Sequence, residues 1–148
     1  MAVTPNSIVT PQGPFIAGFN LAAVTACATR APTPIASAAA ANIFLVSGPT
    51  ANGLRLDRIL VKGSSSSISA TTAAQTVTIW LSDGATLWPI DEILVTAVIP
   101  STTVASYQGI SVYSGLVLPS TWSIYVSTSV TTTAATTALT GIATGAVL

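Results

Sequence analysis

The stretch Thr76-Val-Thr-Ile-Trp-Leu-Ser82 decides the fold class of this chain, because its side chains alternate between two kinds. Val77, Ile79 and Leu81 fall at every second position, which places them on one face of a β-strand. Thr, Trp and Ser occupy the positions between them, and these would line the other face. Asp83-Gly84 follows directly and predicts a tight turn into a hairpin.

Strand signals recur along the rest of the chain, separated by turn residues. Further strands are predicted at 42–47, 54–62, 87–88, 92–99, 109–112, 116–118, 121–127 and 141–148. The Ala-rich residues 36–41 are too few for a stable isolated helix and are expected to lead into the strand after them. About eight short strands without a long helix predict an all-β fold, a β-sandwich or jelly roll.

The strand predicted over residues 54–62 contains four of the eight charged residues. Its alternation slips at Arg58, which predicts a β-bulge there. Asp57, beside Arg58, is expected to form a local ion pair or to be a strand-edge charge. Arg55, Arg58 and Lys62 form a small cationic cluster, which either contacts a partner carboxylate or consists of solvated charges that discourage edge pairing.

Residues 1–20 are predicted to form an extended N-terminal arm, and residues 21–148 a single β-sandwich domain. Pro5, Pro11 and Pro14 fix φ and remove amide donors, which disfavours regular structure in this segment. Such an arm either frays as a free terminus or lies across a neighbouring subunit.

The candidate protein-contact residues come from the arm, the charged strand and two aromatic positions on Thr/Ser faces. They are Pro5, Ile8, Pro11, Phe15, Arg55, Arg58, Trp80 and Tyr125. Trp122 is instead expected in the core, because it shares a face with Ile124 and Val126. The alternative for the exposed aromatic rings, Trp88 included, is stacking on a carbohydrate.

Only eight of the 148 residues are charged, and there is no histidine. Soluble domains average about 25% charged residues, so the side chains that usually perform acid–base catalysis and bind metals are scarce here. Adjacent Asp91 and Glu92 would point to opposite faces of a strand, and Asp83 is expected to form a turn. Cys27, with no histidine to activate it, is expected to be a small packed group. We therefore predict no enzymatic activity, metal or cofactor.

The composition also bears on possible partners. The longest apolar run, residues 35–46, is shorter than the roughly 20 residues that a spanning helix needs. Four scattered cations and a net charge of zero predict no nucleic-acid binding. Ser and Thr together number 40, so the outward strand positions are expected to carry mostly small hydroxyl groups that another subunit can cover.

Several segments resemble small structural proteins encoded in the head-gene region of tailed bacteriophages. They are the opening Met1-Ala-Val-Thr-Pro-Asn-Ser-Ile-Val-Thr-Pro-Gln12, Gly53-Leu-Arg-Leu-Asp-Arg-Ile59, the strand Thr76–Leu81 and the turn Leu118-Pro119. The C-terminus, Ala146-Val-Leu148, departs from the polar or aromatic ending expected of such proteins.

This resemblance implies a virion protein that decorates or cements a capsid. It implies contacts with the major capsid protein and with further copies of itself, as a homotrimer on the capsid surface. Other roles in the same setting are a tail-tube, connector or fibre component.

Overall fold

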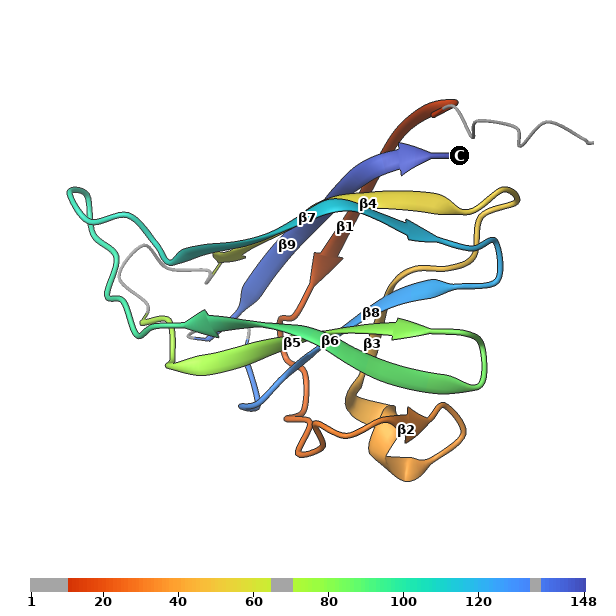
Figure 1. Ribbon diagram of the computed structural model, residues 1–148. Coiled ribbons are helices and arrows are strands. Elements are labelled where there is room, and N and C mark those ends of the chain that lie inside the picture. Colours follow the sequence, from red (N-terminus) through yellow and green to blue (C-terminus); the bar gives the residue numbers. More distant parts are fainter. Residues whose placement is uncertain (1–10, 65–70, 134–136) are drawn as a thin grey trace, which may run out of the picture.

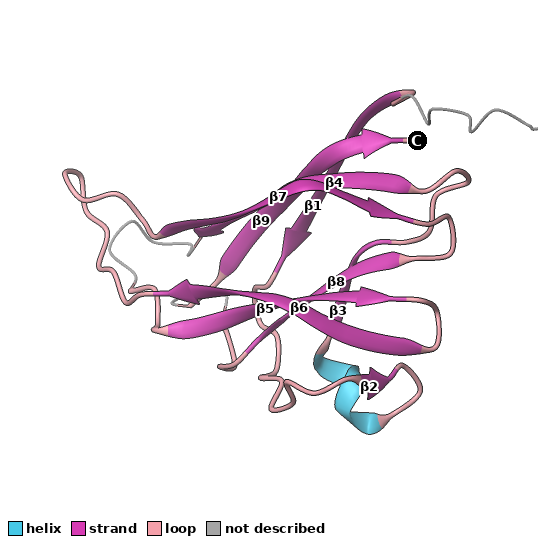
Figure 2. Ribbon diagram, in the orientation of Figure 1, coloured by secondary structure: helices cyan, strands magenta, loops and turns pink. Residues whose placement is uncertain are grey.

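Extended strands dominate the structure, as expected for a chain rich in Thr, Val and Ile. The computed structural model describes residues 11–64, 71–133 and 137–148, and within them two antiparallel sheets stack as an all-β sandwich (Figures 1 and 2). Between the sheets, β7 (Gln108–Leu118) packs over β6 (Thr86–Val95), and β1 (Gly13–Asn20) packs over β3 (Phe44–Ser47).

The four-stranded sheet has the order β1-β9-β4-β7, and its strands are β1 (Gly13–Asn20), β9 (Leu139–Val147), β4 (Leu54–Gly63) and β7 (Gln108–Leu118). The five-stranded sheet has the order β2-β6-β5-β8-β3, and its strands are β2 (Thr33–Pro34), β6 (Thr86–Val95), β5 (Gln75–Ser82), β8 (Ser123–Thr128) and β3 (Phe44–Ser47). A short 3-10 helix, η1 (Ala38–Asn42), precedes β3. No helix in the described ranges is both long and apolar enough to cross a membrane.

The main core lies between the two sheets and confirms the alternation read from β5. Val77, Ile79 and Leu81 are all buried there, together with Ile124 and Val126 of β8. The four-stranded sheet contributes apolar side chains from β4 and β9, namely Leu54, Leu56, Ile59, Val61, Leu139 and Ala143. Trp122 is partly buried and packs against this core, as predicted.

The bulge predicted near Arg58 is confirmed. The register of β4 shifts between Leu56 and Arg58 against both of its neighbours, β7 and β9. The backbones of β4 and β9 approach closely at this point, because a Cβ added at Gly145 would overlap the carbonyl oxygen of Arg55. Only glycine therefore fits at residue 145 without a backbone shift.

The hairpin between β5 and β6 is also confirmed. Asp83 forms its turn: Oδ1 accepts hydrogen bonds from the backbone N–H groups of Ala85 and Thr86, each at 2.8 Å. The strands predicted after this turn, at 87–88 and 92–99, belong to one strand, β6, which ends at Val95, so residues 96–99 lie outside it. Pro89 lies in β6 beside a register shift, where Ile79 pairs with Asp91 and Trp80 with Pro89, and proline within a sheet is typical of such irregularities.

Several other strand predictions need correction. Residues 13–20 are not part of an extended arm, because they pair along their whole length with β9 as β1. Pro14 lies within that stretch, and β1 is at a sheet edge, where proline is tolerated. The strands predicted at 109–112 and 116–118 are a single strand, β7, which bends at Gly115 with φ of 73°.

The segment between β1 and β3 forms a second, smaller core on the outer side of the five-stranded sheet. Figure 1 shows this segment, which includes β2 and η1, on the side of that sheet facing away from the four-stranded one. Its buried members are Cys27, Ala40, Ile43, Trp80 and Leu87, with Tyr125 packed against them. The packed role predicted for Cys27 is thus confirmed.

Candidate protein-contact surface

The two sheets differ in what covers their outer sides. In the described part of the chain, residues 27–43 cover part of the outer side of the five-stranded sheet, and no element packs over the outer side of the four-stranded sheet. We call the latter the open face. Five of its apolar side chains, from all four strands, are Ile16, Leu60, Ile110, Val112 and Ile142. Exposed Val117 of β7 lies further along the same face, opposite Arg55.

Strand register brings these apolar side chains together on the open face. Leu60 of β4 lies between Ile110 of β7 and Ile142 of β9. Ile16 of β1 is opposite Thr144, one step along the same face from Ile142. Side chains opposite or diagonal to one another on a sheet face lie within contact distance, so these five strand positions form a continuous apolar stripe.

The stripe is concave. A groove of about 300 Å³ is lined by Ile16, Arg58, Leu60, Gln108, Ile110, Ile142 and Thr144. Its walls are mostly branched aliphatic side chains, which lose little conformational freedom when a partner covers them.

Two cations stand on the open face. Arg58 lies opposite Val112 and Thr144, and its Nε donates to Thr144 Oγ1 at 3.2 Å. Lys62 lies two steps further along the same face of β4, beyond Leu60, and is exposed. Among the described residues, neither cation has an ion-pair partner.

The acidic residue expected to pair locally on β4 does so, but with Arg55. Arg55 Nε and one terminal nitrogen donate to the two carboxylate oxygens of Asp57, at 2.8 and 3.1 Å. This hydrogen bond and the nearby charge raise the pKa of Arg55. β4 lies between β9 and β7, so its charges do not protect a sheet edge, and that alternative for the cluster is wrong.

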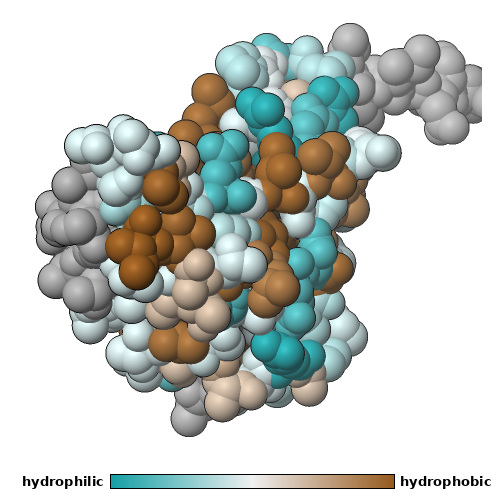
Figure 3. All heavy atoms as spheres, turned by 90° about the vertical axis from the view of Figure 1, so that its left-hand side faces the viewer, coloured by the Kyte–Doolittle hydropathy of each residue, from teal (hydrophilic) through white to brown (hydrophobic). Residues whose placement is uncertain are grey.

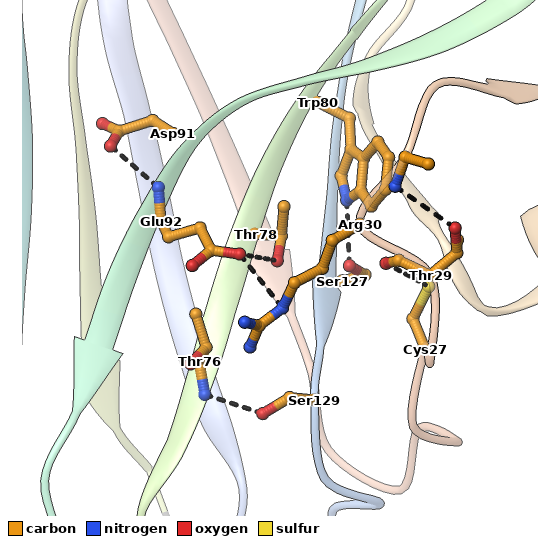
Figure 4. A network of polar contacts seen from close by, with 11 residues as sticks. Cys27, Thr29, Arg30, Thr76, Thr78, Trp80, Asp91, Glu92, Ser127 and Ser129 are labelled. Atoms are coloured by element: carbon orange, nitrogen blue, oxygen red, sulfur yellow. Dashed lines mark hydrogen bonds and ion pairs between the residues drawn. The ribbon is translucent and has the colours of Figure 1, made fainter.

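The covered face of the five-stranded sheet carries a polar network instead (Figure 4). Arg30 from the covering segment pairs with Glu92 of β6 at 3.1 Å, and Thr78 donates to the same carboxylate oxygen at 3.5 Å. Trp80 Nε1 donates to Ser127 Oγ at 2.9 Å. These bonds satisfy hydroxyl and indole groups that the covering segment removes from water.

Asp91 and Glu92 point to opposite sides of β6, as predicted. Glu92 reaches the covered face, whereas Asp91 Oδ2 accepts a hydrogen bond from Tyr113 Oη of β7 at 3.1 Å. Burial raises the pKa of Tyr113, and the charge of Asp91 raises it further. In the turn, the backbone N–H groups of Thr86 and Ala85 lower the pKa of Asp83.

Two predicted contact residues are corrected, because the chain itself buries them. Phe15 is in the main core, and Trp80 is fully buried in the second core. Trp80 falls on a Thr/Ser face, as the sequence suggested, but a distant segment encloses that face. Tyr125 is half-buried against the same core.

The remaining predicted contact residues lie apart from one another. Pro11 is exposed just before β1, and Pro5 and Ile8 lie outside the described residues. Arg55 is half-buried on the outer side of β4 and bound to Asp57, so Arg58 is the predicted residue that lines the groove of the open face. The sequence analysis did not identify Ile16, Val112 and Ile142 as contact residues, although the alternation in residues 109–112 was a signal for Val112.

Exposed apolar side chains also occur outside the open face. Figure 3 views the end of the sandwich where the β6–β7 connection lies, and brown apolar surface is interspersed with polar surface there. Leu94, Ile99 and Val104 are exposed in this region. No set of three Cys, Asp or Glu side chains within the described ranges is grouped as a metal site would require.

Comparison with known proteins identifies no relative. No protein-family model matches the sequence, and neither a curated protein nor a solved structure is significantly similar to it.

Proposed function

We propose that this protein is a non-enzymatic structural protein of a tailed-bacteriophage virion that decorates or cements the capsid by binding capsid subunits and further copies of itself. The observation that carries the proposal is the open face, an apolar sheet surface that the described residues leave uncovered on a sandwich with very few charges. Exposed apolar surface of this kind is typical of interaction sites. The phage setting rests on the sequence resemblance.

The sparse charge supports a role inside an assembly. A free protein relies on surface charge to stay apart from its neighbours, whereas interface cores are depleted of charged residues. A shell component binds through many repeated contacts, so each contact can be weak while the assembly is stable.

The decisive experiment is to purify heads and tails separately from the phage whose genome encodes this chain. Quantitative mass spectrometry would then count the copies in each fraction. We expect hundreds of copies on tailless heads. Recovery with tails alone, at low copy number, would favour a tail-tube, connector or fibre component instead, and absence from both fractions would overturn a virion role.

Self-association is tested on the free protein. Native mass spectrometry should give three times the chain mass of 14.8 kDa if the protein is a homotrimer. A monomer at micromolar concentration would overturn the trimer.

The arm is tested by removing residues 2–10, which leaves β1 intact because that strand begins at Gly13. Head occupancy should fall if these residues contact the capsid or a neighbouring subunit, and unchanged occupancy would remove that role.

Carbohydrate binding gains no support from Trp80, whose ring is enclosed. Trp88 keeps a partly exposed ring, so a glycan array with the wild type and Trp88→Ala tests what is left of that alternative.

A further inference from the structure

We infer that the open face binds a different protein that presents carboxylate side chains on an apolar surface, and that Arg58 and Lys62 recognise those carboxylates. This inference rests on the proposed function, because it places that partner in the capsid. The groove supplies apolar contact area, and the two cations supply the charge that selects the partner.

The charge distribution of the chain points to an acidic partner. The four strands of the open-face sheet carry Arg55, Arg58 and Lys62 against the single acidic residue Asp57, a net charge of three minus one, or +2. Asp57 is occupied by Arg55, so Arg58 and Lys62 have no ion-pair partner among the described residues.

A second copy of this face is a poor partner for the first. A symmetric contact would bring Arg58 and Lys62 close to their own counterparts, and like charges in an interface oppose association. The partner must therefore present a surface of the opposite charge.

The acidic side of a second copy is a weaker match than a different protein. The remaining carboxylates are already engaged: Glu92 with Arg30, Asp91 with Tyr113, and Asp83 with its own turn. Contacts between copies are then made through other surfaces.

Nucleic acid is also a poor match for this groove. Two cations among branched aliphatic side chains neutralise few phosphates, whereas binding to a nucleic-acid backbone gains its strength from many such contacts. A protein surface with apolar and acidic groups fits both components of the face.

The sequence offers a direct chemical test, because Lys62 is the only lysine in the chain. A carbodiimide joins an amine to a contacting carboxylate without a spacer, so treated heads should yield a peptide that links Lys62 to an Asp or Glu of another head protein. In the reagent control, Lys62→Arg keeps the cation but removes the amine, and its heads must give no product at this position.

Binding is tested in parallel with Val112→Asp. This substitution places a carboxylate opposite Arg58 and in the path of the partner's acidic groups. Heads lacking the protein would be titrated with each variant, and the concentration for half-occupancy should rise about tenfold or more, since one misplaced charge in an interface costs at least about 1.4 kcal/mol.

The matched control is Leu94→Asp on the other sheet. Val112 is 72% exposed and Leu94 70% exposed, so the two substitutions disturb folding to a similar, small degree. Leu94→Asp should bind heads as the wild type does. Thermal melts of both variants would verify that they are folded.

The outcomes separate this inference from the proposed function. If the wild type occupies heads but Val112→Asp binds equally well and Lys62 gives no product, the inference fails alone. A Lys62 product with a second copy, identified by mixing isotope-labelled and unlabelled chains, would replace the acidic partner with a self-contact. Wild type absent from heads would overturn both proposals.

Discussion

On the outer sides of the two sheets, the mostly polar side is covered and the apolar side is exposed, which is the reverse of the usual pattern. The five-stranded sheet directs Thr76, Thr78 and Ser82 outward, together with Trp80, and the chain folds back over this mostly polar side. The four-stranded sheet directs Ile, Leu and Val outward, and the described chain leaves that side uncovered. Polarity of the outward positions therefore does not decide which sheet face meets solvent in this protein.

The reason lies in hydrogen bonding and in connectivity. A hydroxyl-rich face can be buried at little cost when each polar group finds a partner, and Ser127 and Glu92 provide two of those partners. The connection from β1 to β3 is long enough to cross the five-stranded sheet. Apolar groups on the open face are then left for another molecule to cover.

The largest expected effect comes from removing the centre of the covered face. Trp80→Ala should lower the free energy of unfolding by about 3–5 kcal/mol, since it leaves a large cavity in the second core and deprives Ser127 of its donor. Urea unfolding followed by circular dichroism measures this. Trp88→Ala, at a ring that is 42% exposed, should cost clearly less; equal costs would mean that the covered face is not a core.

The next effect concerns the backbone beneath the open face. Gly145→Ala should cost about 2–3 kcal/mol, because the added Cβ overlaps the carbonyl of Arg55 and forces β4 and β9 apart. Gly18→Ala on neighbouring β1 is the control, as the nearest atom to its Cβ lies 4.0 Å away. Similar melting temperatures for the two variants would refute close packing of β4 on β9.

A smaller effect is expected at the polar contact between the two sheets. Tyr113→Phe should cost about 1 kcal/mol at neutral pH by removing the donor to Asp91. Because folding raises the pKa of Tyr113, its contribution to the free energy of unfolding is complete below the ordinary tyrosine pKa of about 10. That contribution declines as the pH rises beyond about 10. The stability difference between wild type and variant should thus narrow above pH 10, and a constant difference would contradict the assignment.

The smallest effect should occur on the open face itself. Val112→Thr keeps a β-branched side chain and should change the free energy of unfolding by less than about 0.5 kcal/mol. Guanidinium titration is sufficient to measure it. A loss comparable to that of Trp80→Ala would show that residues outside the described ranges, or a further copy, already cover this face in the free protein.

Much of the strand pattern was accessible from sequence. Alternation identified the inward face of β5, the slip at Arg58 identified the bulge, and Asp83-Gly84 identified the hairpin turn. Each of these is a local property, set by the two-residue period of a strand or by the preferences of turn residues. β1 was missed because the prolines near it suggested an arm, and pairing with the distant β9 overrode that local signal.

The candidate surface was less accessible, since Arg58 was found but Trp80 and Phe15 were misplaced. A strand has two faces, and its sequence distinguishes them without indicating what lies over either one. In this chain, the outer face of β5 is buried by a segment that lies some forty residues before Trp80 in the sequence.

The sequence alone determined the shortage of charge, the strand period and the positions of turns, because these follow from residue types and their neighbours. Tertiary structure alone decided which outward faces are buried, because that depends on pairing and packing between segments far apart in the chain. The cations of β4 illustrate the division. Their spacing can be read from the sequence, but their position beside the apolar groove arises only when β1, β9 and β7 align with β4.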